Sequence, residues 1–253
     1  MDTLTVAEEA ARAAGELLLA RFGEGRAAAG AIASKSTPTD LVSDADLAAE
    51  TAIREILRAR VPDDGIRGEE HDDESGTSGR SWIVDPLDGT VNYLYGHPQW
   101  CVSVACEGEA GVIFDPVRDE LFAAARDRPA TLNGRELRVN GAPSLAQALL
   151  ATGFGYDARI RAAQAAVVAR ALPSVRDIRR AGSAALDLAW AAAGRVDAYY
   201  ERGVQPWDIA AGTLICAQAG LIVAPLPADG DHVPAGICVA PPALLDELLQ
   251  LVA

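Results

Sequence analysis

The chain is organised around the stretch Trp82-Ile83-Val84-Asp85-Pro86-Leu87-Asp88-Gly89-Thr90, in which apolar residues run into two aspartates and a Gly-Thr pair. Pro86 has no backbone N–H and fixes its own φ, so we expect the strand to end at Asp85. Gly89 allows a ligand to approach the backbone closely. Two carboxylates at the end of a buried strand suit hard cations such as Mg²⁺. The same residue types are also common in solvated turns, which is the alternative interpretation of this stretch alone.

Ahead of this stretch, the sequence predicts two helices and an acidic loop. Thr5-x-x-Glu8 has the form of a capping box, and apolar residues follow at helical spacing up to Gly23. Ser43-x-x-Asp46 has the same form and predicts a second helix that reaches Pro62. Residues 61–80 are polar and rich in turn residues and acids, so we expect part of this segment to be a solvated acidic loop.

Beyond Thr90, the pattern divides the chain into two halves near residue 143. Several β-branched runs and the hairpin-like segment around Asn133-Gly134 predict a largely antiparallel sheet in residues 1–143. A linker is expected at residues 140–144, after which strands and helices alternate. We therefore expect an N-terminal α+β half over residues 1–143, which carries most of the candidate metal ligands. A C-terminal α/β half over residues 144–253 carries Asp208 and the substrate-side residues.

Composition excludes several classes of partner. The chain has 253 residues and a formal net charge of −14, which disfavours nucleic acid because a backbone binder needs a positive surface. No uninterrupted apolar run approaches the roughly 20 residues that a membrane span needs. The first five residues carry an acid and no positive charge, which argues against a secretory signal. A soluble, cytoplasmic protein is expected, with its four cysteines acting as small buried hydrophobes.

Five carboxylates stand at predicted element ends beside Gly, Pro or Trp: Glu69, Glu70, Asp85, Asp88 and Asp208. Clustered carboxylates repel one another unless cations or protons lie between them. Two divalent ions about 3.5–4 Å apart would bind phosphoryl oxygens and lower the pKa of a bound water. Such ions also explain how an acidic protein could bind an anionic phosphate, because the ions set the local charge.

Three segments together resemble the inositol monophosphatase family of magnesium-dependent, lithium-sensitive phosphatases: Gly68-Glu69-Glu70, Asp85-Pro86-Leu87-Asp88-Gly89-Thr90-Val91-Asn92 and Trp207-Asp208-Ile209-Ala210-Ala211-Gly212. The resemblance covers nearly the whole chain, including residues 35–46 and Gly182-Ser183-Ala184. It implies a five-layer αβαβα sandwich of the sugar-phosphatase type. It also implies a homodimer whose sites lie between the two halves of each chain, in keeping with the expected linker.

The resemblance further implies a set of Mg²⁺ ligands. Glu69, Asp85 and the Leu87 carbonyl would bind one ion, and Asp85 would bridge to a second ion held by Asp88 and Asp208. Asp46 and Glu70 would act through water, and a third, weaker ion remains an open alternative. The simpler alternatives are that Asp46 is only a helix cap and that Glu70 is a solvated acid or a partner of Lys35.

Substrate roles follow from the same resemblance. Thr90 would orient the attacking water, its hydroxyl bonded to Asp46, and the amides of Gly89 and Thr90 would bind phosphate. Asp208 would also lie against the substrate. The alcohol part of the substrate would meet Gly182, Ser183, Ala184 and Glu201. Arg179-Arg180 could attract phosphate, or it could have a solvated or interface role.

The implied activity is hydrolysis of inositol monophosphate, or of a similar small phosphorylated alcohol, by a metal-activated water and without a covalent phospho-enzyme. Relatives with the same metal residues hydrolyse histidinol phosphate, fructose 1,6-bisphosphate or 3′-phosphoadenosine 5′-phosphate, and these remain alternatives. A different class of function is a non-catalytic, regulatory role as a protein-binding partner, for RNA polymerase or another protein. A Ca²⁺ buffer is disfavoured because EF-hand spacing is absent from the sequence.

Overall fold

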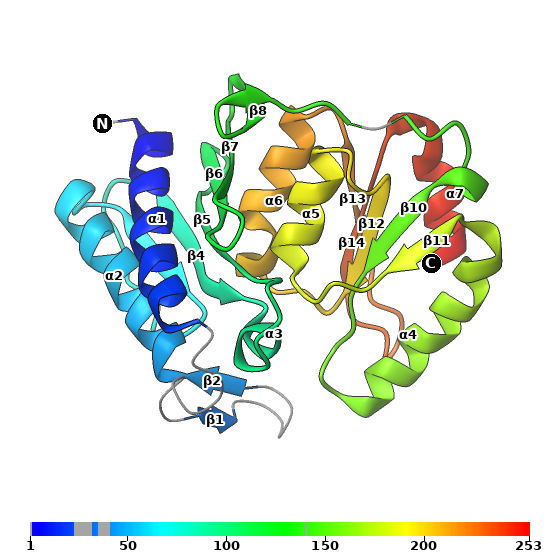
Figure 1. Ribbon diagram of the computed structural model, residues 1–253, viewed down its shortest axis with the longest axis horizontal. Coiled ribbons are helices and arrows are strands. Elements are labelled where there is room, and N and C mark those ends of the chain that lie inside the picture. The colour runs from blue at the N-terminus through cyan, green and yellow to red at the C-terminus, as the bar shows by residue number, and fades with distance from the viewer. Residues whose placement is uncertain (1, 23–31, 35–40, 140) are drawn as a thin grey trace.

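The computed structural model describes residues 2–22, 32–34, 41–139 and 141–253, which form five layers of helices and sheets (Figure 1). Residues 23–31, residues 35–40 with Lys35, and Asn140 of the expected linker lie outside the described residues. Two larger sheets are separated by one layer of helices, and each sheet is covered on its outer face by a further helix pair. This arrangement confirms the predicted αβαβα sandwich.

The first sheet has seven strands in the order β3-β4-β5-β6-β7-β8-β9. Its strands are β3 (Gly65–Gly68), β4 (Ser81–Asp88), β5 (Cys101–Cys106), β6 (Ala110–Asp115), β7 (Glu120–Ala125), β8 (Arg128–Leu132) and β9 (Arg135–Glu136). Only the β3–β4 pair is parallel, so the sheet is largely antiparallel, as predicted. The β8–β9 turn places Asn133 and Gly134 at positive φ, the conformation that favours this dipeptide in hairpins.

Helices α1 (Thr3–Arg21) and α2 (Asp44–Arg60) cover the outer face of the first sheet (Figure 1). Their buried residues recur at helical spacing and pack with the sheet in one apolar cluster that includes Val6, Ile53, Trp82 and Val104. The short helix α3 (Thr90–Leu94) follows β4, and β1 (Ile32–Ser34) pairs with β2 (Leu41–Ser43) in a separate two-stranded sheet.

The second sheet has five strands in the order β11-β10-β12-β14-β13. The strands are β10 (Leu149–Thr152), β11 (Asp177–Arg179), β12 (Ala198–Arg202), β13 (Ile222–Leu226) and β14 (Gly236–Ala240). The middle layer consists of α5 (Ala184–Ala192) and α6 (Pro206–Gln218), whose apolar residues contact both sheets. On the outer face lie α4 (Ala158–Ala171) and α7 (Pro242–Val252), with the 3-10 turns Leu145–Gln147 and Leu172–Ser174 nearby in the chain.

The two large sheets are built from residues on either side of the expected linker. The middle helices come from the second half of the chain and pack on the first sheet as well. Because the layer of α5 and α6 packs against both sheets, the two halves of the chain have a common core, and the division into domains at residue 143 stays a prediction. All four cysteines are buried, as predicted. No helix in the described part of the chain combines the length and apolar character needed to cross a membrane.

Within residues 61–80, the stretches 71–73 and 75–80 are exposed and belong to no named helix or strand, in keeping with a solvated loop over part of this segment, and residues 65–68 form the strand β3. Two local predictions are wrong. α1 begins at Thr3, because Leu4 packs against the core and extends the helix, so Thr5 is inside the helix and does not cap it. The strand β4 also continues beyond Asp85, to Asp88. Its pairing with β5 shifts register between Asp85 and Asp88, so the absent N–H of Pro86 removes no hydrogen bond from a regular ladder.

Candidate active site

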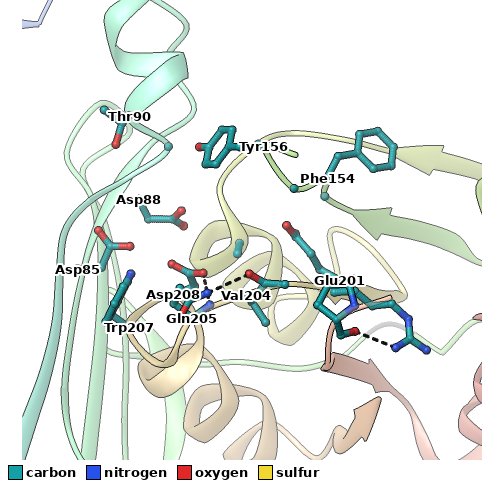
Figure 2. Close-up of a pocket in the computed structure, with 18 of the residues that line it drawn as sticks. Asp85, Asp88, Thr90, Phe154, Tyr156, Glu201, Val204, Gln205, Trp207 and Asp208 are labelled. Carbon is teal, nitrogen blue, oxygen red and sulfur yellow. Dashed lines mark hydrogen bonds between the residues drawn. The ribbon is translucent and has the colours of Figure 1, made fainter. Parts of the chain in front are cut away.

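A cavity of about 690 Å³ opens between the end of β4 and the starts of α5 and α6. Its wall combines residues from both halves of the chain (Figure 2). The predicted site residues that line it are Glu69, Asp85, Leu87, Asp88, Gly89, Thr90, Gly182, Ala184, Glu201 and Asp208. The structure thus brings together most of the residues that the sequence singled out, although they are widely separated along the chain.

The shift in register of β4 explains how both of its aspartates reach the cavity. Side chains alternate between the faces of a regular strand, so residues three apart would lie on opposite faces. Between Asp85, which pairs with Ser103, and Asp88, which pairs with Cys101, the strand is irregular. Asp85 is almost fully buried, and its Oδ1 accepts a hydrogen bond of 3.0 Å from the Leu87 N–H. Burial raises its pKa well above the usual value, and repulsion from Glu69, Asp88 and Asp208 raises it further.

Asp88 is held by the N-terminus of α5. Its Oδ2 accepts hydrogen bonds from the Ser183 hydroxyl at 2.6 Å and from the Ala185 N–H at 2.7 Å. Ser183 is also the N-cap of α5 and accepts from the Leu186 N–H at 3.3 Å. Burial raises the pKa of Asp88 to about 6, even though the bonds from Ser183 and Ala185 lower it. The anion therefore lies where the helix N-terminus favours negative charge.

Asp208 occupies the first turn of α6, close to Asp85 and Asp88 of β4 (Figure 2). Its Oδ2 accepts a hydrogen bond of 2.6 Å from the Gln205 N–H, and Gln205 completes a capping box. Burial raises the pKa of Asp208 well above its usual value, and the charge of Asp88 adds to the effect. The helix cap therefore fixes a carboxylate that faces those of β4.

Thr90 is buried beside these acids, at the first position of α3. Its hydroxyl lies 3.2 Å from Asp46 Oδ1 and 3.1 Å from the Leu87 carbonyl oxygen, so its single proton is directed toward these two acceptors. The hydroxyl oxygen then retains lone pairs that can accept from a water. Gly89 before it has a φ of 100°, and a Cβ there would lie 2.8 Å from the Gln99 carbonyl oxygen, so only glycine fits.

Glu201 enters the cavity from β12, across from Asp88 (Figure 2). The Tyr199 hydroxyl donates to its Oε2 at 2.9 Å. Burial raises the pKa of Glu201 to about 7, the bond from Tyr199 lowers it, and the charge of Asp88 raises it. Gly153 leaves room for this carboxylate, since a Cβ on that residue would overlap Glu201 Oε2. Because Glu201 lines the cavity, its ionised carboxylate can accept a hydrogen bond from an alcohol there.

The acids of this cavity suit a divalent cation in their chemistry. Asp85, Asp88 and Asp208 are oxygen donors, and each has a pKa raised by burial and by another acid of the group. Within the described ranges, no three acidic, histidine or cysteine side chains are arranged to hold one ion as they stand. The positions of these side chains therefore fit a Mg²⁺ ion that is held by one or two carboxylates, with carbonyl oxygens and waters as its other ligands. The three-carboxylate set implied for the second ion would require a side chain to move.

Three predicted site residues do not line the cavity: Asp46, Glu70 and Ser183. Asp46 is buried on α2 and accepts the Thr90 bond, and Ser183 acts through Asp88. Glu70 is half-buried, and its backbone N–H donates to Glu50 Oε2 at 2.7 Å. The partnership of Glu70 with Lys35 falls outside the described residues.

Sequence reasoning missed the far wall of the cavity. Phe154, Tyr156, Val204 and Pro234 line it, and Trp207 lines the cavity below Asp85 (Figure 2). Residues 153–155 directly follow the apolar run that forms β10 and begin with glycine, a pattern like the one at Gly89, so this segment could have been found from the sequence. Of the two adjacent arginines, Arg180 lines the cavity, whereas Arg179 forms an ion pair of 2.6 Å with Asp177.

Comparison with known proteins gives one family. The model of the inositol monophosphatase family matches residues 1–253. Inositol-1-monophosphatase SuhB of Mycobacterium tuberculosis is 44% identical over 247 residues, which cover 91% of this chain and 83% of that protein. Nus factor SuhB of Xylella fastidiosa is 46% identical over 220 residues, or 84% of this chain and 78% of that protein. The crystal structure of extragenic suppressor protein suhB from Bartonella henselae superposes with a TM-score of 0.87 at 34% identity, covering 98% and 97% of the two chains.

Proposed function

Because the chain belongs to the inositol monophosphatase family, a family of phosphatases, we propose that it is a Mg²⁺-dependent phosphomonoesterase acting on inositol monophosphate or a similar small phosphorylated alcohol. The observation that carries the proposal is the group of mutually repelling carboxylates, Asp85, Asp88 and Asp208, in one cavity with Glu69. Two Mg²⁺ ions, with a third as the open alternative, would neutralise these acids. The name of the M. tuberculosis relative supports inositol 1-phosphate as the first substrate to test.

The bound ions would supply a Lewis acid for the phosphoryl oxygens and lower the pKa of the attacking water. Glu69, Asp85 and the Leu87 carbonyl would hold one ion. Asp85, Asp88 and Asp208 would hold the other once one of these side chains has moved toward it. The Thr90 hydroxyl, whose proton faces Asp46 and the Leu87 carbonyl, would accept a hydrogen bond from the water and fix its direction. The amides of Gly89 and Thr90 would bind the phosphate.

The alcohol part of the substrate would lie toward the second half of the chain. Glu201 would accept a hydrogen bond from a substrate hydroxyl, next to Gly182, Ser183, Ala184 and Asp208. Histidinol phosphate, fructose 1,6-bisphosphate and 3′-phosphoadenosine 5′-phosphate are the competing substrates. A homodimeric, cytoplasmic, lithium-sensitive enzyme completes the proposal.

A test of the mechanism is Asp85→Asn, which keeps an acceptor for the Leu87 N–H but removes the charge. Release of phosphate from inositol 1-phosphate should fall by at least about 100-fold, because a ligand that positions charge stabilisation is lost. In the presence of a chelator, the variant should be at least as stable as the unchanged protein, because a neutral amide would relieve the repulsion that raises the pKa of Asp85.

The matched control is Asp73→Asn, which removes one negative charge from an exposed side chain. Turnover retained by Asp85→Asn would remove Asp85 from the mechanism. A panel of the four substrates, each with and without Mg²⁺, measures substrate choice. No hydrolysis of any of them would contradict the proposed activity.

A second candidate is a regulatory, protein-binding role, which the name of the X. fastidiosa relative, Nus factor SuhB, supports. A pull-down that compares the unchanged protein with Asp85→Asn separates the two functions. A protein contact should survive a substitution that abolishes hydrolysis, because Asp85 is almost fully buried.

A further inference from the structure

The loop that carries Glu69 is attached to a buried carboxylate on α2. Glu50 is fully buried, and its two oxygens accept hydrogen bonds from the backbone of the loop. Oε2 accepts from the Glu70 N–H at 2.7 Å, and Oε1 from the His71 N–H at 3.2 Å. The Glu70 N–H belongs to the peptide group that directly follows Glu69. Glu50 therefore binds the backbone next to a proposed metal ligand.

The close approach of Gly68 shows how tightly the loop packs on this carboxylate. A Cβ on Gly68 would overlap Glu50 Oε1, so the strand β3 can end against the acid only because residue 68 has no side chain. Glu69 then follows directly and lines the cavity. The carboxylate thus contacts the backbone on both sides of Glu69.

Arg54 balances the charge of Glu50 and extends the attachment along the loop. Its Nε donates to Glu50 Oε1 at 2.7 Å, and only 2% of its side chain is exposed. Its Nη1 donates to Glu74 Oε1 at 2.7 Å and its Nη2 to the His71 carbonyl oxygen at 3.3 Å. One ion pair on α2 therefore binds the loop at residues 70, 71 and 74.

We propose that Glu50 is a positioning residue for catalysis, which fixes the backbone around Glu69 so that this side chain faces the metal-binding cavity before any ion arrives. The inference rests on the proposed function. A purely structural role is the competing explanation, but a buried ion pair adds little stability compared with apolar packing. The two amide bonds of Glu50 instead restrain the orientation of the loop, and outer partners of ligands typically change metal affinity by about 10- to 100-fold.

The test is Glu50→Gln, compared with Glu55→Gln, which removes the same charge from an exposed position of the same helix. A glutamine amide presents one acceptor oxygen where Glu50 presents two. Mn²⁺ binding, followed by the electron paramagnetic resonance signal of the free ion, should weaken about 10- to 100-fold in Glu50→Gln and less than about twofold in Glu55→Gln. Excess Mg²⁺ should restore much of the turnover of inositol 1-phosphate by Glu50→Gln.

A folded Glu50→Gln variant with lower thermal stability but unchanged Mn²⁺ affinity would overturn the inference in favour of a structural role. If this variant does not fold, hydrogen exchange of the unchanged protein decides. The Glu70 and His71 amides should exchange slowly in the presence of a chelator, and fast exchange would overturn the inference. Mn²⁺ binding that depends on Glu50 without any phosphatase activity would contradict the proposed function alone.

Discussion

Among single residues, the site is a set of carboxylates kept in surroundings that oppose their ionisation. Asp85 and Asp208 have pKa values well above the usual range, and burial is the largest cause in both. In the absence of cations such a site lowers the stability of the native state, because the acids must either bind protons or repel one another. The acids were identifiable from the sequence, but their repulsion depends on the folded arrangement.

The effect of one such acid, Glu201, on the stability of the native state can be measured. Its pKa is raised from 4.5 to about 7, so the native state binds its proton more tightly than the unfolded chain does. With a chelator present, its contribution to stability should be complete below pH 4.5 and should be lost as the pH rises through about 7. In Glu201→Gln the decrease in the free energy of unfolding that Glu201 causes between pH 4.5 and about pH 7 should disappear, as measured by chemical denaturation from pH 4 to pH 8.

The control for that series is Glu107→Gln, which removes an exposed carboxylate and should leave the pH dependence unchanged. If the curves of Glu201→Gln and the unchanged protein run parallel across the whole range, Glu201 does not carry a raised pKa in the native state.

Among the helices and strands, helix N-termini hold the acids in place. α5 presents Ser183 and the Ala185 N–H to Asp88, and α6 fixes Asp208 in its capping box. β4 contributes the irregular segment that brings Asp85 and Asp88 to the same cavity. Secondary-structure ends therefore set the site geometry, because the backbone there has unpaired donors.

Ser183→Ala tests the link between α5 and Asp88. The substitution removes the N-cap bond to Leu186, which should lower the free energy of unfolding by about 1 kcal/mol. It also removes the 2.6 Å bond to Asp88, so the pKa of Asp88 should rise above about 6 and Mg²⁺ activation should shift to higher pH. Turnover measured against pH and Mg²⁺ concentration checks the second effect.

Ser174→Ala, at an exposed position outside the site, is the matched control and should change neither quantity. Loss of stability by Ser183→Ala without any shift in the pH dependence of Mg²⁺ activation would limit Ser183 to a helix cap.

In the molecule as a whole, the α5–α6 layer separates the two large sheets (Figure 1). The cavity at the edge of this layer is lined by residues of both halves of the chain. Glu69, Asp85 and Asp88 come from the first half of the chain, and Asp208 and Glu201 from the second. An ion bound between them would stabilise the native state, by an amount that grows with the logarithm of the ion concentration divided by its dissociation constant, since it would bind only the folded arrangement.

Excess Mg²⁺ should therefore raise the thermal unfolding temperature, and more at pH 8 than at pH 5. At pH 5 the ion must displace the proton of Asp88, whose pKa is about 6. Differential scanning calorimetry with Mg²⁺ and with a chelator at the two pH values measures the difference. An equal gain at both values would contradict the coupling of metal binding to these acids, and Asp85→Asn should lose most of the gain at pH 8.

The layered class of the fold and most residues of the site were predictable from the order of the amino acids. Helical spacing, β-branched runs and turn residues are local signals, and they predicted the first two helices, the largely antiparallel first sheet and the alternation of strands and helices beyond residue 144. The resemblance carried by Gly68–Glu70, Asp85–Asn92 and Trp207–Gly212 then selected the acids that line the cavity. The prediction of an acid-rich site at Asp85 to Thr90 depended on the distant Glu69 and Asp208.

How these residues act together depends on the packing of the folded chain. The register of β4 is set by its pairing with β5, so the residues of β4 alone predicted a strand that ends too early. The bonds from Ser183 to Asp88 and from Glu70 to Glu50 join residues 95 and 20 positions apart. The cavity wall around Phe154 faces the acids only after the two halves pack on α5 and α6. Contacts of this kind leave no periodic signal, because packing between distant segments decides which side chains meet.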